Sequence, residues 1–310
     1  MERSGGTALT SLADGDAWLH ELAADTDAVV EQIGTGYSDR PLWAVTIGAG
    51  RARVAVIATQ HGDEPGPREG VLAFMRDLAY QATDLHAALY THGAWTFVPT
   101  ANPNGLHYGH RPNSWEADGG DLNRDWLDFA FPETQAMRDW IAAVQPALAL
   151  DLHEHQGTTT TSLMATGRQS AAAVPAHLAI QSAALNAHIG DDLLSRGWTW
   201  EAYADGVTPT LARVALGNLY RVTTNLSESD RTADLIDREG VNRDYLESVA
   251  AHWLEHSQAF ENARVWSGAD PLDGIPVDDP PSADSGLFAT DGMPVALFRT
   301  DGTPAVGLAI

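Results

Sequence analysis

Cysteine is absent from the 310 residues of this sequence. Its absence excludes disulfide bonds, and it also excludes thiolate ligands, so any metal site must be built from histidine and carboxylate donors. The lack of cysteine is consistent with a reducing compartment. The first residues, MERSGGTALTSL, do not contain the apolar core of a signal peptide. From these two features we expect a cytoplasmic protein.

Lysine is absent as well, so all 18 basic residues are arginine, against 42 acidic residues and a net charge of −24. A surface this acidic repels nucleic-acid phosphates and anionic lipids. The sequence also has no run of about 18 apolar residues, the length that a membrane span requires. We therefore expect neither a nucleic-acid partner nor a membrane partner, and the sequence leaves the oligomeric state open. Against this acidic background, an arginine near a functional site is a candidate anion binder.

Apolar residues follow two different periods along most of the chain. Short runs that are continuously apolar or rich in β-branched residues predict strands, and segments with a period near 3.6 predict helices. The alternation of the two predicts an α/β domain whose mixed, mainly parallel central sheet is flanked by helices. The predicted strands cover 41–48, 53–60, 94–100, 147–155 and 220–229, and the predicted helices cover about 11–34, 66–81, 132–144, 170–197 and 243–263.

The composition changes near residue 267. The segment SGADPLDGIPVDDPPSADSG is rich in proline, glycine and aspartate, and two TDG turns then separate short apolar runs. Such a segment favours a linker and a small β extension over a second core. We therefore divide the chain into a catalytic domain, 1–266, and an appendage, 267–310.

Ligand-type side chains follow three of the predicted strands. His61 and Glu64 come after 53–60, His153 follows ALALDL near the end of 147–155, and Glu228 follows YRVTTNLS near the end of 220–229. Functional sites in open α/β sheets form at the carboxyl ends of strands. Two histidines and one glutamate from these ends predict a three-ligand site for one zinc ion per chain, with manganese, iron and cobalt as open alternatives. A further acid then remains to act on a metal-bound water.

Two of these assignments have competitors within the sequence. His155 lies two residues beyond His153, on the same face of an extended strand. Glu201 and Glu247 compete with Glu228, although only Glu228 ends a β-like run.

Five short motifs occur in a fixed order: HGDE at 61–64, NPNG at 102–105, an arginine at 111 followed by GGDLNRDW at 119–126, DLH at 151–153, and the late Glu228. This order resembles that of the carboxypeptidase A-like zinc peptidases over about residues 35–262. The gap of 89 residues from Glu64 to His153 (153 − 64) is similar to that of bacterial-type members and of the aspartoacylase and succinylglutamate desuccinylase branch.

The resemblance implies a role for each matching residue. It implies that the metal ligands are His61, Glu64 and His153, and that Asp121 is the carboxylate that orients the first ligand histidine. It further implies that Arg111 polarises the scissile carbonyl and that Glu228 is the general base. The expected substrate-binding residues are Asn123 and Arg124, which would hold a terminal carboxylate, with Arg213 and Tyr203 as further candidates and Tyr220 as an alternative to Tyr203.

Three functions are compatible with this set. The first hypothesis is a zinc metallocarboxypeptidase that releases the C-terminal residue of a peptide. The second is a zinc amidohydrolase acting on N-acyl amino acids or cell-wall peptides with the same residues. The third is a catalytically silent zinc-binding protein, which would be expected to have lost the base or the carbonyl-polarising arginine. In the first two cases the expected partner is a peptide or acyl-amino-acid substrate with a free carboxylate.

Overall fold

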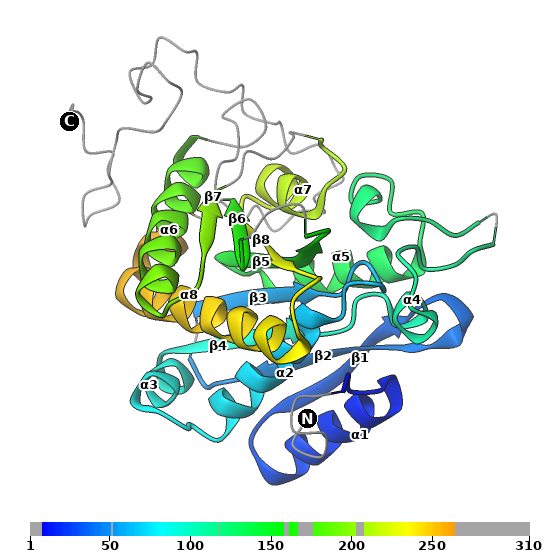
Figure 1. Ribbon diagram of the computed structural model, residues 1–310, viewed down its shortest axis with the longest axis horizontal. Helices are drawn as coiled ribbons and strands as arrows, with labels where there is room; N and C mark the ends of the chain where they lie inside the picture. Colours follow the sequence, from blue (N-terminus) through cyan, green and yellow to red (C-terminus); the bar gives the residue numbers. More distant parts are fainter. Residues whose placement is uncertain are drawn as a thin grey trace.

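The computed structural model describes residues 8–50, 52–116, 118–157, 161–166, 176–202 and 208–263. These residues form one eight-stranded mixed sheet with the strand order β1-β2-β4-β3-β5-β8-β6-β7 (Figure 1). The predicted appendage at 267–310 and the predicted domain boundary lie outside them. The strands are β1 (Val29–Thr35), β2 (Pro41–Ile47), β3 (Ala52–Ala58), β4 (Gly93–Val98), β5 (Leu148–His155), β6 (Leu163–Thr166), β7 (Trp200–Ala202) and β8 (Thr223–Asp230).

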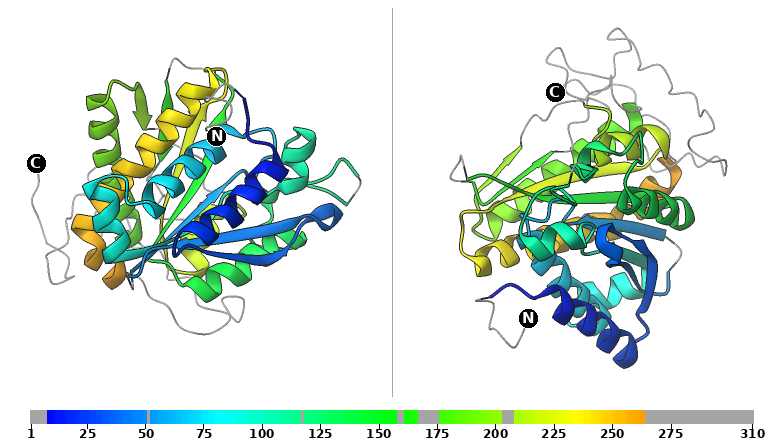
Figure 2. Two further views of the ribbon diagram at one scale, coloured as in Figure 1. Left: turned by 90° about the horizontal axis from the view of Figure 1, so that it is seen from below. Right: turned by 90° about the vertical axis from the view of Figure 1, so that its right-hand side faces the viewer.

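Helices cover both faces of the sheet (Figure 2). One face packs against α1, α2, α3, α6 and α8, and the other packs against α5 and α7. Within the described ranges, none of the helices is long and apolar enough to cross a membrane. The helices are α1 (Leu12–Asp25), α2 (Gly66–Ala79), α3 (Asp84–His92), α4 (Pro103–Tyr108), α5 (Pro132–Val144), α6 (Ala176–Ser195), α7 (Ala212–Leu219) and α8 (Leu235–Ala263).

The four central strands β4, β3, β5 and β8 are mutually parallel. Their side chains alternate between two cores: Val54 and Val56 of β3 face the α2 and α8 side, whereas Ala55 and Ile57 face the α5 and α7 side. Burial on both faces explains why β3 and the first residues of β5 are continuously apolar in the sequence. The expected α/β class with a mixed, mainly parallel sheet is confirmed.

The strand order of the sheet reverses at β3. After β3 it forms β4 on one side of that strand, and it later returns to form β5 on the other side. The loops that leave β3 and β5 therefore diverge at their carboxyl ends, which is where α/β sheets form binding crevices. His61 and Glu64 follow β3, and His153 lies near the end of β5.

Some predicted elements were wrong in extent. The predicted helix at 11–34 ends at Asp25, and its last part is the antiparallel edge strand β1, because VVEQIG pairs with β2. Strands β2 and β3 follow each other in the chain but do not pair, since β4 lies between them. Helix α8 begins eight residues before the predicted start at 243, at Leu235 (243 − 235). The short elements α3, α4, β6, β7 and α7 were not predicted.

Candidate metal centre

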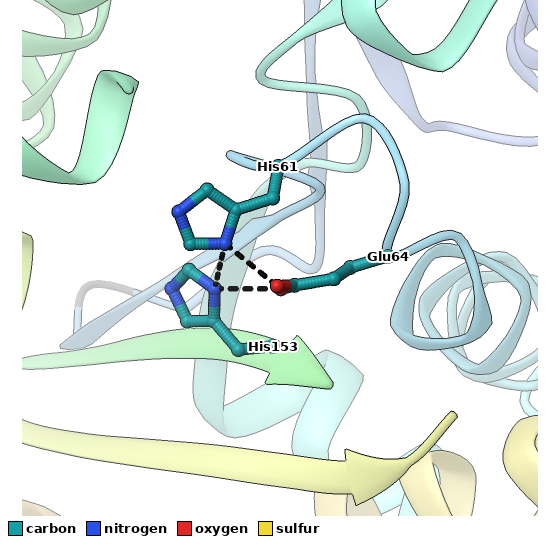
Figure 3. Close-up of side chains that lie close together, drawn as sticks. All are labelled: His61, Glu64 and His153. Carbon is teal, nitrogen blue, oxygen red and sulfur yellow. Dashed lines mark hydrogen bonds and ion pairs between the residues drawn. The ribbon is translucent and has the colours of Figure 1, made fainter. Parts of the chain in front are cut away.

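Three buried side chains converge at the carboxyl ends of β3 and β5 (Figure 3). His61 Nδ1 lies 2.9 Å from Glu64 Oε1. His153 Nδ1 lies 3.0 Å from Glu64 Oε2 and 3.1 Å from His61 Nδ1. Each residue thus turns one donor atom toward a common point. Among the described residues, this is the group of three histidine or carboxylate side chains whose donor atoms all lie within 4.8 Å of one another.

The chemistry of this cluster fits a divalent metal ion. Donors bound at about 2.0–2.1 Å around tetrahedral zinc lie about 3.3 Å apart, close to the 2.9–3.1 Å separations found here. Burial alone would raise the pKa of Glu64, but hydrogen bonds and charge from His153 and His61 hold that pKa well below its usual range. The cluster therefore favours positive charge at its centre, which either protons or a cation can supply.

Both histidine rings are oriented by a carboxylate on the far side from this centre. His61 Nε2 is 3.0 Å from Asp121 Oδ1, and His153 Nε2 is 2.8 Å from Asp151 Oδ1. A proton on each Nε2 leaves both Nδ1 lone pairs directed at the cluster, the arrangement that carboxylates impose on metal-binding histidines. Asp121 is where the motif places it. Asp151 was missed by the sequence analysis, although it lies two residues before His153 and therefore on the same face of β5.

His155 has both ring nitrogens engaged elsewhere. Its Nδ1 accepts a hydrogen bond from the backbone N–H of Gly157 at 3.1 Å, and its Nε2 lies 3.2 Å from the carbonyl oxygen of Thr161. This pattern corresponds to a neutral ring with no lone pair left for a metal. The geometry favours His153 over His155 as the ligand.

Glu228 lies at the end of β8, beside His153 of β5 in the parallel register. Both residues line a cavity of about 310 Å³ above the cluster. Burial raises the pKa of Glu228 to about 7, an effect that the negative charge of Glu64 reinforces and the two histidines oppose. The competing Glu247 forms an ion pair with Arg196 and Glu201 is exposed, and neither lines this cavity.

Two arginines line the same cavity. Arg111 bridges the centre, with Nη1 3.2 Å from Glu64 Oε1 and Nη2 2.9 Å from Asp121 Oδ2. Arg124 is exposed, and its Nη1 donates only to the carbonyl oxygen of Asn123 among the hydrogen bonds of the described residues. Arg124 is the cation of this wall that is best placed to meet an incoming anion.

Asn123 is fixed inside the wall of the cavity. Its Oδ1 accepts from the backbone N–H of Ala212 at 2.8 Å, and its Nδ2 lies 3.0 Å from His153 Nε2. Asn123 lies within the short 3₁₀ turn Leu122–Arg124. Asp121 caps this turn by accepting a hydrogen bond from the backbone N–H of Asn123. The DLNR motif thus places Asp121, Asn123 and Arg124 around the centre.

Two of the remaining candidates, Arg213 and Tyr220, do not line the cavity. Arg213 of α7 is 1% exposed and is not among the lining residues. Tyr220 is buried in the apolar cluster on the α5 and α7 side. Tyr203 lies outside the described residues. Met164, Leu211 and Leu226 supply the apolar part of the lining, and the sequence analysis named none of them.

Two further arginines fasten the loop that carries His61 and Glu64. Arg238 forms two hydrogen bonds with the buried Glu154, at 2.7 and 2.6 Å, and Glu154 Oε2 accepts from the backbone N–H of Gly66. The backbone N–H of Glu154 in turn donates to Glu64 Oε2 at 3.1 Å. Arg231 donates to the carbonyl oxygen of Asp63 at 2.8 Å. No motif in the sequence pointed to this clamp.

A family model for zinc carboxypeptidases matches residues 16–208 of this chain. The chain belongs to the zinc carboxypeptidase family. Carboxypeptidase 2 of Trichophyton tonsurans is 32% identical to it over 105 residues, which are 34% of this chain and 19% of that protein. The match therefore spans about a fifth of this curated relative.

Solved metallocarboxypeptidases have the same fold as this member of the family. The metallo-carboxypeptidase of Burkholderia cenocepacia superposes with a TM-score of 0.64 and 20% identity, covering 78% of this chain and 69% of that one. Carboxypeptidase A of Helicoverpa armigera superposes with a TM-score of 0.64 and 19% identity, covering 80% of this chain and 74% of that one. The metallo-carboxypeptidase of Pseudomonas aeruginosa, solved with (2-guanidinoethylmercapto)succinic acid, superposes with a TM-score of 0.63 and 20% identity. The match covers 78% of this chain and 68% of that one. The resemblance inferred from the five motifs is confirmed.

Proposed function

We propose that this protein is a zinc-dependent metallocarboxypeptidase that hydrolyses the C-terminal peptide bond of its substrate. The observation that carries the proposal is the placement of Glu228, Arg111 and Arg124 around one cavity whose floor is the His61, Glu64 and His153 cluster. A carboxylate that is not part of the metal cluster, and two cations that line the same cavity, are the groups that amide hydrolysis at a substrate terminus requires.

His61, Glu64 and His153 would hold one zinc ion per chain. When bound, zinc supplies Lewis acidity that lowers the pKa of a water molecule and polarises a carbonyl. Asp121 and Asp151 hold the two imidazole rings in the tautomer that leaves Nδ1 free.

Glu228 takes a proton from the attacking water and delivers it to the leaving amine. Its position beside His153 and its partial burial in the cavity suit this shuttle. Arg111 donates hydrogen bonds to the oxygen of the scissile carbonyl as negative charge develops there, once it turns from Glu64 and Asp121. Arg111 has the room to do so, because its side chain is 41% exposed.

Arg124 and Asn123 bind the free carboxylate of the substrate. The planar fork of a guanidinium matches a carboxylate with two parallel hydrogen bonds. The Pseudomonas aeruginosa enzyme was solved with a succinic acid derivative, which is consistent with carboxylate recognition on this fold. A substrate that ends in an amide loses this interaction and should be a poor one.

A substrate panel tests the proposal. Zinc-loaded protein is incubated with peptides that have free C-termini, with the same peptides amidated, and with N-acyl amino acids, and products are identified by mass spectrometry. Release of single C-terminal residues from the free peptides alone is the expected result. Cleavage of the N-acyl amino acids alone would overturn the peptidase assignment in favour of a deacylase. No cleavage with zinc present at one ion per chain would favour the silent zinc-binding protein.

A further inference from the structure

Three aromatic side chains form a ridge next to the cavity, which we call the aromatic ridge: Tyr108, His110 and Trp115. Tyr108 is 64% exposed and Trp115 is 77% exposed. Exposed tryptophan and tyrosine side chains that adjoin a functional cavity are typical of binding surfaces, because they offer a large rigid contact area.

The rings of the ridge are held in contact with one another. Tyr108 and His110 are stacked, with ring centroids 5.9 Å apart and an angle of 8° between the planes. His110 and Trp115 follow at 4.8 Å. The middle ring is fixed because His110 is 6% exposed and its Nδ1 lies 2.6 Å from the carbonyl oxygen of Pro112. Trp115 therefore rests on an immobile ring.

His110 and Trp115 lie in the loop that follows α4, and the same loop carries Arg111 and Asp121 (Figure 1). The loop is closed by hydrogen bonds between Asn113 and Gly120, at 3.0 and 2.8 Å. Trp115 stands at the tip beyond this closure, whereas Arg111 and Asp121 stand at its base and contact Glu64 and His61. The link between the ridge and the cavity is His110, which directly precedes the cavity-lining Arg111.

The α4 end of the ridge is also packed against the metal-binding loop. Gly62 lies so close to the backbone of Gly105 that no side chain would fit between them, and its N–H points to the carbonyl oxygen of Arg111 at 3.4 Å. The position of the ridge relative to the centre is therefore set by close backbone contacts.

The charge around the ridge favours a cation. Glu116 and Asp118 each lie 2.8 Å from the hydroxyl oxygen of Tyr37. A phenol has one proton and can donate to only one carboxylate at a time, so the second keeps its negative charge unmatched by this donor. The flat face of an aromatic ring attracts cations. The guanidinium carbon of Arg40 lies 5.9 Å from the centre of the Tyr108 ring, so the inference concerns the ring of Trp115.

We propose that the aromatic ridge binds a basic side chain of the peptide substrate, in the part of the peptide that precedes the scissile bond. This inference rests on the proposed function. A peptide whose scissile carbonyl meets Arg111 continues upstream from that arginine, and His110 is its immediate neighbour in the chain. Trp115 supplies the ring face, and the acidic pair beside it supplies the charge.

The experiment compares two substrates with the same C-terminal residues: a blocked dipeptide, and a hexapeptide with arginine at its upstream positions. Trp115→Ala should lower the ratio of kcat/KM for the hexapeptide over the dipeptide by about two- to fivefold, the range that a cation–π contact provides at an exposed site. The loss should appear in KM rather than in kcat. Trp115→Phe, which keeps an aromatic face, should restore most of the ratio.

Tyr80→Ala is the matched control, because Tyr80 is an aromatic residue 53% exposed at the end of α2. It should leave the ratio as in the wild type. Replacing the upstream arginines of the hexapeptide by norleucine should remove the dependence on Trp115. An unchanged ratio in Trp115→Ala, or an equal loss with the norleucine peptide, would overturn the inference.

Direct binding separates a failure of the inference from a failure of the proposed function. The same hexapeptide carrying a fluorophore is titrated with the zinc-loaded Glu228→Gln variant with and without Trp115→Ala. Weaker binding in the double variant supports the ridge even if no peptide is cleaved, a result that would count against the proposed function alone. Equal binding by both proteins overturns the ridge even if the dipeptide is cleaved.

Discussion

His153 and Glu228 are direct neighbours across the parallel strands β5 and β8. Paired residues in adjacent parallel strands point to the same face of the sheet, so a proposed ligand and the proposed base enter one cavity from two different strands. The next pair, Glu154 and Ser229, faces the opposite way. Because the proposed ligand and the proposed base are different residues, single substitutions can test the two roles separately.

Replacing Glu228 by Gln should abolish most of the hydrolysis and leave the metal in place. The amide cannot accept the proton from water, and loss of a general base typically lowers kcat by about 10²–10⁴. The check is kcat together with metal content by mass spectrometry. Glu201→Gln, at an exposed position of β7, is the control and should behave as the wild type. Near-full activity of the Glu228 variant would show that the base is another group.

Replacing His153 by Ala should remove metal and activity together, whereas His155→Ala should keep the metal. The two residues lie on the same strand face, but only His153 directs a ring nitrogen at Glu64, and His155 uses both nitrogens on backbone partners. The measurement is zinc stoichiometry after dialysis against a weak chelator. Full zinc occupancy in the His153 variant would contradict the ligand assignment.

Replacing Arg238 by Met should destabilise the fold by roughly 3–5 kcal/mol, because the buried Glu154 carboxylate loses its partner. Burial already raises the pKa of Glu154, against the opposing effect of Arg238. A folded-state pKa above the unfolded value means that the folded state binds protons more tightly, so stability of the variant should fall as the pH rises through that pKa. Urea unfolding at several pH values measures this.

The double variant Glu154→Met with Arg238→Met is the control for this prediction. It removes the unpaired charge and should regain most of the lost free energy of unfolding. The double variant should bind zinc more weakly than the wild type, because Gly66 loses its hydrogen bond to Glu154 next to the metal-binding loop. Wild-type zinc affinity in the double variant would show that the clamp does not act on the centre.

His252 of α8 should remain neutral down to low pH. Burial is the main cause that lowers its pKa, and repulsion from the neighbouring His256 and His188 adds to it, so that the pKa is about 3. The unfolded chain takes up this proton near pH 6.5. The free energy of unfolding therefore has its full value for this group above pH 6.5 and decreases as the pH falls toward 3. A titration of the imidazole signals by NMR, assigned with His252→Gln, tests this. A midpoint near 6.5 would contradict it.

The parts of the site that could be predicted share a feature. His61 and Glu64 follow the continuously apolar β3, and His153 follows the apolar first residues of β5, so the places where these apolar runs end were visible in the sequence. The DLNR motif located Asp121, Asn123 and Arg124 because their roles depend on one short turn. Asp151 could have been found from the two-residue period of a strand.

Other features depended on pairing partners that are distant in the chain. Strand β1 continues the polar and apolar pattern of α1, and only its pairing with β2 makes it a strand. The clamp joins Glu154 to Arg238, 84 residues away, and no local pattern records that contact. Arg213 was singled out by its position before Glu228, but α7 buries it outside the cavity lining.

The contact between His61 and His153 joins positions 92 residues apart in a chain without cysteine. An ion held by both rings would close that loop, as a disulfide closes one in a secreted protein, and would remove conformational freedom from the unfolded chain. Unlike a disulfide, this tie opens with a chelator or with acid. The concentration of available metal ion would then affect the stability of the folded protein as well as its activity.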